Sequence, residues 1–217
     1  MTLNARRKPY IWATWLVGLL SGEKHCEWAP WLKAHYQYDK VDEDPSRENA
    51  LSKWKADHAV MVTEHAMVLR ADGWRVRVEA QNKFTYRGQV ADLGGAPDVT
   101  AVQQGTLRVD DIKGGKARDE HFWQVALYGV LLPLVSRDYA ELVVVGNVVY
   151  PDRLRPLDAA DIVRAKPLIV DRIKRSAAPA EPARTPSAAE CAWCDIANCP
   201  DRAASAGPEM AVEGDLF

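Results

Sequence analysis

Three residues near the middle of the chain could carry the chemistry of a metal-dependent hydrolase. Asp98 begins a predicted strand, and Asp111 and Lys113 end the next strand along the chain. A tight turn joins these two strands, so their outer ends are expected to be adjacent. Side chains alternate along a strand, which places Asp111 and Lys113 on one face and Ile112 on the other. Two carboxylates and an ammonium group are therefore predicted to converge.

Such a set suits the hydrolysis of a phosphodiester bond. Carboxylate oxygens bind a hard Mg²⁺ or Mn²⁺ ion, which activates water and stabilises charge on the phosphoryl oxygens. A lysine beside that water can orient it or accept its proton. A D-x-K pattern alone is weak, because an Asp and a Lys paired at a solvated strand end are more frequent. Its place after a hairpin and before a helix favours the catalytic interpretation.

The elements that must position these residues are helices and strands in mixed order. Apolar residues at helical spacing predict helices, and alternating patterns predict strands. Helices are predicted at 10–20, 28–38, 48–72, 120–134 and 158–175, and strands at 74–78, 84–86, 98–102, 106–113 and 140–150. This order predicts an α/β fold, a mixed sheet flanked by helices, preceded by a helical N-terminal region.

Composition divides the chain into four segments. Residues 1–176 are predicted to form one domain with its own core, and residues 177–190 form a linker rich in Ala and Pro. A cysteine segment follows at 191–202, and the tail at 203–217 lacks periodicity and is expected to be flexible.

The four cysteines have the spacing of a metal or cluster site. Three of them, Cys191, Cys194 and Cys199, lie within nine positions, and Cys26 is far away in the sequence. This is a poor framework for a disulfide scaffold. Four thiolates suit either zinc or an iron-sulfur cluster, so ligand number does not decide between them. The alternative is that Cys26 is a small core residue and the triplet binds zinc weakly or nothing.

Several of these motifs resemble those of the PD-(D/E)xK nuclease superfamily. Pro97-Asp98 followed by Asp111-x-Lys113 resembles its signature, and Gln124 with Tyr128 resembles the Q-x-x-x-Y element of the RecB-like branch. One cysteine before the core and three after it resemble the arrangement that holds a 4Fe-4S cluster in AddB-type and CRISPR-associated RecB-like exonucleases.

The resemblance implies a restriction-endonuclease-like core and a single-stranded DNA exonuclease that uses Mg²⁺ or Mn²⁺. The branch also places a metal-binding histidine on the helix before the strands, and His58 is favoured over His65. The implied metal ligands are His58, Asp98, Asp111 and the Ile112 carbonyl. Lys113 would act on the attacking water, and Gln124 and Tyr128 would position the lysine or the substrate. The implied cluster ligands are Cys26, Cys191, Cys194 and Cys199, which would close the C-terminal segment onto the N-terminal helices.

Residues beside the predicted site suggest contacts with a DNA strand. Lys116 and Arg118 precede the aromatic run 121–123, a mixture that can bind phosphates and stack on bases. Equally, this run can be the start of a helix whose aromatic residues face the core. Glu79, on the strand after the long helix, could approach the metal, but a solvent-facing strand residue is the preferred interpretation. The ending 214–217 faintly resembles peptides that bind sliding clamps, although a disordered tail is the preferred interpretation.

Charge and composition limit the function classes without selecting one. The net charge of −2 is unusual for a DNA-binding protein, although carboxylates at a metal site account for part of it. No apolar run reaches the length of a membrane span, and a cytoplasmic protein is expected. Expected partners are DNA and proteins of a repair, replication or CRISPR complex. The rival functions are a non-catalytic DNA-binding or assembly subunit and a zinc-stabilised scaffold.

Overall fold

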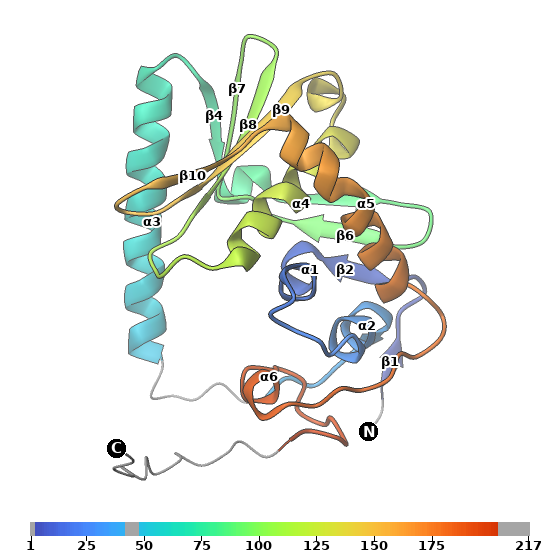
Figure 1. Ribbon diagram of the computed structural model, residues 1–217. Helices are drawn as coiled ribbons and strands as arrows, with labels where there is room; N and C mark the ends of the chain where they lie inside the picture. Colours follow the sequence, from blue (N-terminus) through green and yellow to red (C-terminus); the bar gives the residue numbers. More distant parts are fainter. Residues whose placement is uncertain (1–2, 42–47, 204–217) are drawn as a thin grey trace, which may run out of the picture.

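A five-stranded mixed sheet forms the centre of the molecule (Figure 1). The computed structural model describes residues 3–41 and 48–203. The strand order is β10-β9-β8-β7-β4. The bounds are β4 Arg75–Val78, β7 Val99–Gln103, β8 Thr106–Ile112, β9 Val143–Val149 and β10 Leu154–Leu157. Only β8 and β9 run parallel; the other neighbours are antiparallel.

Helices cover both faces of this sheet. The long helix α3 (Glu48–Ala71) packs on one face, and α4 (Asp119–Val135) and α5 (Ala159–Ser176) pack on the other (Figure 1). Because strand side chains alternate, Ile112 joins the apolar cluster under α3, while Val109 joins the larger core under α4. The fold is therefore α/β with a mixed sheet flanked by helices, which confirms the predicted fold class.

The N-terminal region is less helical than its pattern predicts. Residues 10–12 form strand β2 (Tyr10–Trp12), followed by a 3₁₀ turn (Ala13–Trp15) and the short helix α1 (Val17–Ser21). Strand β2 pairs in parallel with β6 (Asp92–Gly95), which also pairs with β5 (Phe84–Arg87). The prediction of a helix from residue 10 was wrong because Ile11 is completely buried and its aromatic neighbours suit a strand.

The second predicted N-terminal helix is shorter than expected. Helix α2 (Trp28–His35) ends where β3 (Tyr36–Gln37) pairs with β1 (Asn4–Ala5). Two further 3₁₀ turns lie at Glu79–Asn82 and Arg137–Tyr139.

The predicted linker packs along α2. Residues 177–187 contain no helix or strand, and a single helical turn, α6 (Ala188–Ala192), follows. The Trp31 indole donates a hydrogen bond of 2.8 Å to the Ala178 carbonyl, and the Trp28 indole donates one of 2.8 Å to Glu181 Oε1. The segment is thus part of the folded body. The predicted tail motif at 214–217 lies outside the described residues.

Within the described ranges, every helix is too short or too polar to cross a membrane.

Candidate functional site

The hairpin β7–β8 brings the two predicted carboxylates together. Its turn uses Gln104 and Gly105 at φ 45° and 77°, left-handed values that suit a two-residue hairpin. The register pairs Val99 with Asp110, so Asp98 and Asp111 are neighbours across the strand ends. Asp98 Oδ2 accepts a hydrogen bond of 2.8 Å from the Ile112 amide, which joins the two strands at this point.

Asp111, Lys113 and Gln124 form a closed group at the end of β8. Asp111 Oδ2 lies 2.8 Å from Lys113 Nζ, and Asp111 Oδ1 accepts a hydrogen bond of 2.7 Å from Gln124 Nε2. Lys113 Nζ donates to Gln124 Oε1 at 3.1 Å. Helix α4 therefore fixes both the carboxylate and the ammonium group through one amide side chain.

Burial makes the Asp111 carboxylate difficult to ionise. Only 1% of the residue is exposed, and this burial raises its pKa to about 7, against the lowering effect of Lys113. The nearby Asp98 carboxylate raises the pKa further. Among the described residues, Asp111 Oδ2 accepts no hydrogen bond of good geometry, although it forms the ion pair with Lys113. An additional cation would lower this energetic cost.

Helix α3 supplies His58 to the same site. His58 Nε2 lies 3.3 Å from Asp98 Oδ2, and this hydrogen bond raises the pKa of the imidazole. The Ile112 backbone also interacts with the ring. His65 instead lies 2.7 Å from Asp110 Oδ2, on the opposite face of β8 from Asp111. The structure thus brings His58 to the other predicted residues and leaves His65 apart.

Two further residues lie near the site, one of which was considered from the sequence and one of which was missed. Glu79 was expected to face solvent from a strand; its side chain is indeed 50% exposed, but the residue begins a 3₁₀ turn at φ 41°, and its Oε1 lies 3.8 Å from His58 Nδ1. A left-handed glutamate is unusual and often marks a functional site. The buried Asn82 donates hydrogen bonds to the backbone carbonyls of Pro97 and Asp98, at 3.1 and 3.5 Å. No sequence signal distinguishes this asparagine from an ordinary turn residue.

Tyr128 lies beneath the site instead of facing a substrate. It is 1% exposed, its ring contacts Phe84 edge-to-face, and its hydroxyl donates to the Ala96 carbonyl at 3.5 Å. Burial raises the pKa of this hydroxyl well above its ordinary value. Tyr128 also interacts with Gln124, so its position suits support of the site from below.

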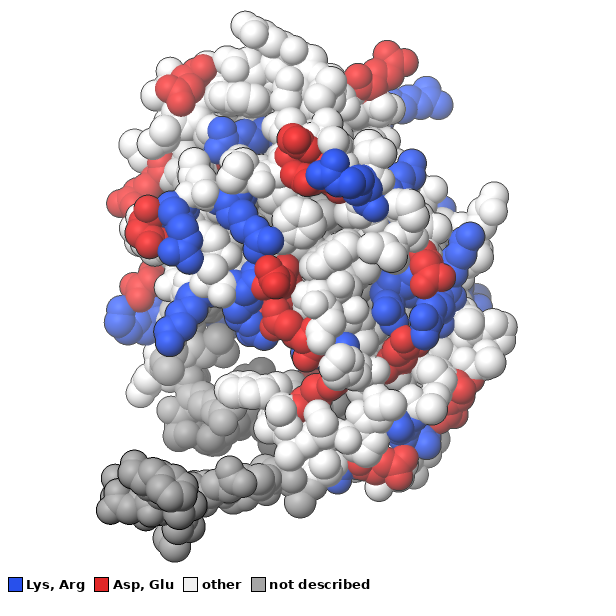
Figure 2. All heavy atoms as spheres, viewed as in Figure 1, with Lys and Arg blue, Asp and Glu red and all other residues white. Residues whose placement is uncertain are grey.

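The two predicted DNA-contacting residues lie in the loop between β8 and α4 and differ in their surroundings. Arg118 forms ion pairs with Glu23 and Glu120, so its charge is already compensated. Lys116 is exposed. On the face shown in Figure 2, basic and acidic side chains are interspersed over most of the surface.

The donor types at the site fit a hard divalent cation. In the chain outside residues 1–2, 42–47 and 204–217, no group of three or more His, Cys, Asp and Glu side chains is arranged to hold a metal ion. Here the carboxylates of Asp98 and Asp111 are engaged by the Ile112 amide and by Lys113. Two carboxylates, one imidazole and one carbonyl are nevertheless suitable donors, and the under-satisfied Asp111 Oδ2 marks where a cation would be stabilised.

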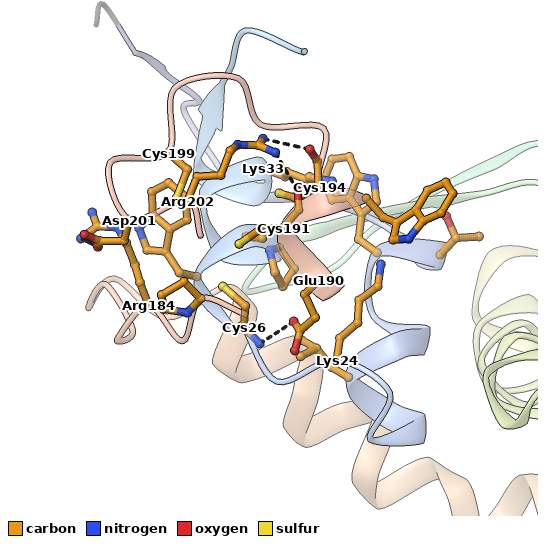
Figure 3. A pocket seen from close by; sticks show the side chains of 18 residues that line it. Lys24, Cys26, Lys33, Arg184, Glu190, Cys191, Cys194, Cys199, Asp201 and Arg202 are labelled. Atoms are coloured by element: carbon orange, nitrogen blue, oxygen red, sulfur yellow. Dashed lines mark hydrogen bonds and ion pairs between the residues drawn. The ribbon is translucent and has the colours of Figure 1, made fainter. Parts of the chain in front are cut away.

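The four cysteines gather around one pocket, which is lined by residues of α2 and α6 (Figure 3). The pocket has a volume of about 130 Å³, and all four cysteines are partly buried free thiols. Burial raises the pKa of Cys199, and the other three thiols raise it further, because they are close enough to interact. The pocket's lining cysteines are Cys26, Cys191, Cys194 and Cys199.

Hydrogen bonds hold the backbone around these thiols. Glu190 accepts hydrogen bonds from the amides of His25 and Cys26 at 3.0 and 3.2 Å. Arg202 donates to the carbonyls of Cys191 and Cys194 at 2.6 and 3.0 Å (Figure 3). The Glu190 hydrogen bonds join α6 to the backbone around Cys26.

Comparisons with known proteins give no family. No family model matches the chain, and no curated protein matches it. Among solved structures, the chain is similar to the crystal structure of SSO0001, at 17% identity and a TM-score of 0.41. The similarity covers 88% of this chain and 85% of that one. A likeness at this TM-score carries no argument about the function.

Proposed function

We propose that the chain is a metal-dependent DNA nuclease of the PD-(D/E)xK superfamily, of the RecB-like branch, that degrades single-stranded DNA from an end. The observation that carries the proposal is the meeting of Asp98, Asp111 and Lys113 at one end of a hairpin, within reach of His58. Helix α4 adds Gln124 to this group. Side chains from separate elements converge on a buried carboxylate. An incidental Asp–Lys ion pair at a strand end would need neither the burial nor the additional side chains.

The proposed roles follow from the contacts of each residue. His58, Asp98, Asp111 and the Ile112 carbonyl would hold Mg²⁺ or Mn²⁺, which supplies Lewis-acid activation of water and neutralises charge on the phosphate. Lys113 would orient the attacking water through a hydrogen bond donated by its Nζ, next to Asp111. Gln124 would keep that ammonium group in place through its Oε1.

The cysteine pocket supports a 4Fe-4S cluster more than a zinc ion. The four thiols line one cavity of about 130 Å³. A structural zinc site requires four sulfurs at ~2.3 Å from one point. A cluster occupies the space between its thiolates and fits a cavity of this kind. Its proposed task is to fasten the C-terminal segment to the N-terminal region.

A nuclease assay tests the catalytic proposal directly. The anaerobically purified full chain would be incubated with end-labelled single-stranded and duplex DNA in Mg²⁺, Mn²⁺ or EDTA. We expect shortening of the single strand with metal only, and no shortening by Asp111→Ala. Asp171→Ala is the matched control, because Asp171 is an exposed aspartate on α5. Cleavage that persists at the full rate in Asp111→Ala would refute the proposal.

Two rival functions give other results in the same preparation. A non-catalytic DNA-binding or assembly subunit would bind DNA without cleaving it. A zinc-stabilised scaffold would be colourless, contain one zinc ion and leave DNA unbound. Participation in a repair, replication or CRISPR complex and a cytoplasmic location stay predictions.

A further inference from the structure

An exposed tryptophan stacks directly on the histidine of the site. Trp54 lies one helical turn before His58 on α3, and the two rings are 5.3 Å apart between centroids with an interplanar angle of 28°. The imidazole in turn reaches Asp98, with Nε2 at 3.3 Å from Oδ2. Yet 54% of Trp54 remains exposed, a large fraction for the largest apolar side chain.

The helix around Trp54 is not packed on the core. All residues from 51 to 57 are exposed, and the strand contacts of α3 are with β4, β7 and β8. The first half of α3 extends past the sheet, towards the region of α6 (Figure 1). Trp54 therefore contributes little to the hydrophobic core, and its indole is available on a projecting helix beside the site.

Exposed basic residues lie next to Trp54 in the sequence and in a loop near α3. Lys53 and Lys55 flank Trp54 and are exposed, although Lys53 is paired with Asp57 at 2.7 Å. The loop that carries Lys116 comes close to α3, since a Cβ added to Gly114 would lie 3.1 Å from Met61 Cε. Figure 2 shows Lys and Arg side chains, interspersed with Asp and Glu, on the side of the molecule where α3 and this loop lie. Exposed cations around an aromatic ring are the usual elements of a single-strand binding surface.

From this geometry, and resting on the proposed nuclease function, we propose that Trp54 is the stacking platform for the nucleobase next to the phosphodiester bond that is cleaved. A base inside a duplex has both faces covered by its neighbours, whereas an unpaired base can stack on a protein ring. Stacking on Trp54 would therefore select single-stranded DNA and place its backbone near Lys116 and Lys113. Trp54 would thus be a binding residue, and its contact with His58 would connect base binding to the metal site.

A simpler role for Trp54 is support of the His58 ring alone. That role predicts weaker metal binding and a lower kcat in a Trp54 variant, with no change in affinity for DNA. The stacking role predicts a change in affinity that depends on the presence of a base at one position of the strand. The two roles are therefore separated by measurements of binding and by changes in the DNA itself.

The binding experiment uses the full chain and a fluorescently labelled single-stranded oligodeoxynucleotide, with Ca²⁺ in place of the metal that supports cleavage. We expect Trp54→Ala to raise Kd by about 5- to 150-fold, the range for loss of one stacked base, with a matching rise in KM in Mn²⁺. Trp54→Phe should recover most of the affinity. Met67→Ala is the control, because Met67 is 62% exposed on the same helix but lies outside the proposed site.

A second test uses a series of oligonucleotides that each lack one base, at a different position of the strand. This test changes the DNA and so does not depend on the folding of a variant. For the wild type, an abasic site at one position near the cleaved end should weaken binding as much as Trp54→Ala does. An abasic site at the same position should not weaken binding by the Trp54→Ala variant any further. A uniform response along the strand, or an unchanged Kd and KM in Trp54→Ala, overturns the inference while the nuclease function survives. Absence of any cleavage by the wild type in Mg²⁺ and Mn²⁺ overturns the proposed function and this inference together.

Discussion

Replacement of Asp111 by Asn should abolish cleavage and at the same time stabilise the metal-free protein. Asp111 is 1% exposed, and burial raises its pKa to about 7. An acid with a pKa raised in the folded state contributes stability below its unfolded pKa, and this stability is lost as pH rises through the folded pKa. Above neutral pH the folded metal-free protein therefore carries the cost of an ionised, buried carboxylate. Asparagine has nearly the same shape and carries no charge.

The size of the effect follows from the pKa shift. A rise from 3.8 to about 7 corresponds to roughly 4 kcal/mol of lost stability at about pH 8. The substitution also removes the ionic partner of Lys113, which lies 2.8 Å from the carboxylate and is itself partly buried. A lost partner for a half-buried charge costs about 1–3 kcal/mol. We therefore expect a net gain of about 1–3 kcal/mol for Asp111→Asn in the absence of metal.

Urea unfolding in EDTA measures this difference. The free energy of unfolding of Asp111→Asn should exceed that of the wild type at about pH 8. This difference should shrink at about pH 4.5, where the wild-type carboxyl is protonated in the folded state. Addition of Mn²⁺ should stabilise the wild type and leave the variant unchanged, because binding to the folded state alone adds stability. A variant that is less stable than the wild type at pH 8 would show that Lys113 fully compensates the buried charge, and the reasoning would be refuted.

Three further substitutions test the other parts of the molecule. Lys113→Ala should lower the single-turnover cleavage rate by about 100-fold or more, whereas Gln124→Ala, which removes only positioning, should lower it by about 10-fold. Cys26→Ala should remove the visible absorption of the cluster and lower the melting temperature; an unchanged metal content and melting temperature would contradict the proposed closure. Burial lowers the pKa of His121 to about 4, so its contribution to stability is present above about pH 6.5 and is lost as pH falls towards 4. Between pH 7 and 4.5, the free energy of unfolding should therefore fall by about 1–2 kcal/mol less for His121→Gln than for the wild type, after allowance for solvent screening. Urea unfolding at the two pH values measures this difference, and equal losses would contradict the assignment.

Elements that depend on local patterns were predictable from the sequence. Helix α3 was expected at 48–72 and lies at Glu48–Ala71, where Gly73 at φ 85° ends it. Strand β6 was missed, because Asp92–Gly95 contains two glycines and is stabilised by partners far away in the sequence. Strand β10 was missed as well, since Pro156 is unfavourable except at the edge of a sheet, where β10 lies.

The part of the candidate site that depends on local patterns was also predictable from the sequence. Asp98, Asp111 and Lys113 lie on one hairpin, so strand alternation and a short turn suffice to bring them together. The choice between His58 and His65 depends on where α3 crosses the sheet, which is set by tertiary packing. Residues that only support the site, such as Asn82, carry no local pattern and become visible when their hydrogen bonds are known.

The proposed role of the cysteine segment as a fastener follows from the small size of the core beside it. Ile196 is completely buried against Trp28, Trp31 and Leu32, which form an apolar cluster separate from the main core. Burial of one isoleucine stabilises by about 1.5–3 kcal/mol. Ordering the segment 191–202 costs roughly 1.5 kcal/mol per residue, which is several times larger. Hydrogen bonds such as that from the Val41 amide to the Asp195 carbonyl, at 2.9 Å, add only about 1 kcal/mol each. Ligation by four thiolates contributes on the order of 10 kcal/mol in structural metal sites, enough to offset much of this deficit. Without a bound cluster or ion, we therefore expect this segment to separate from α2 while the main core stays folded.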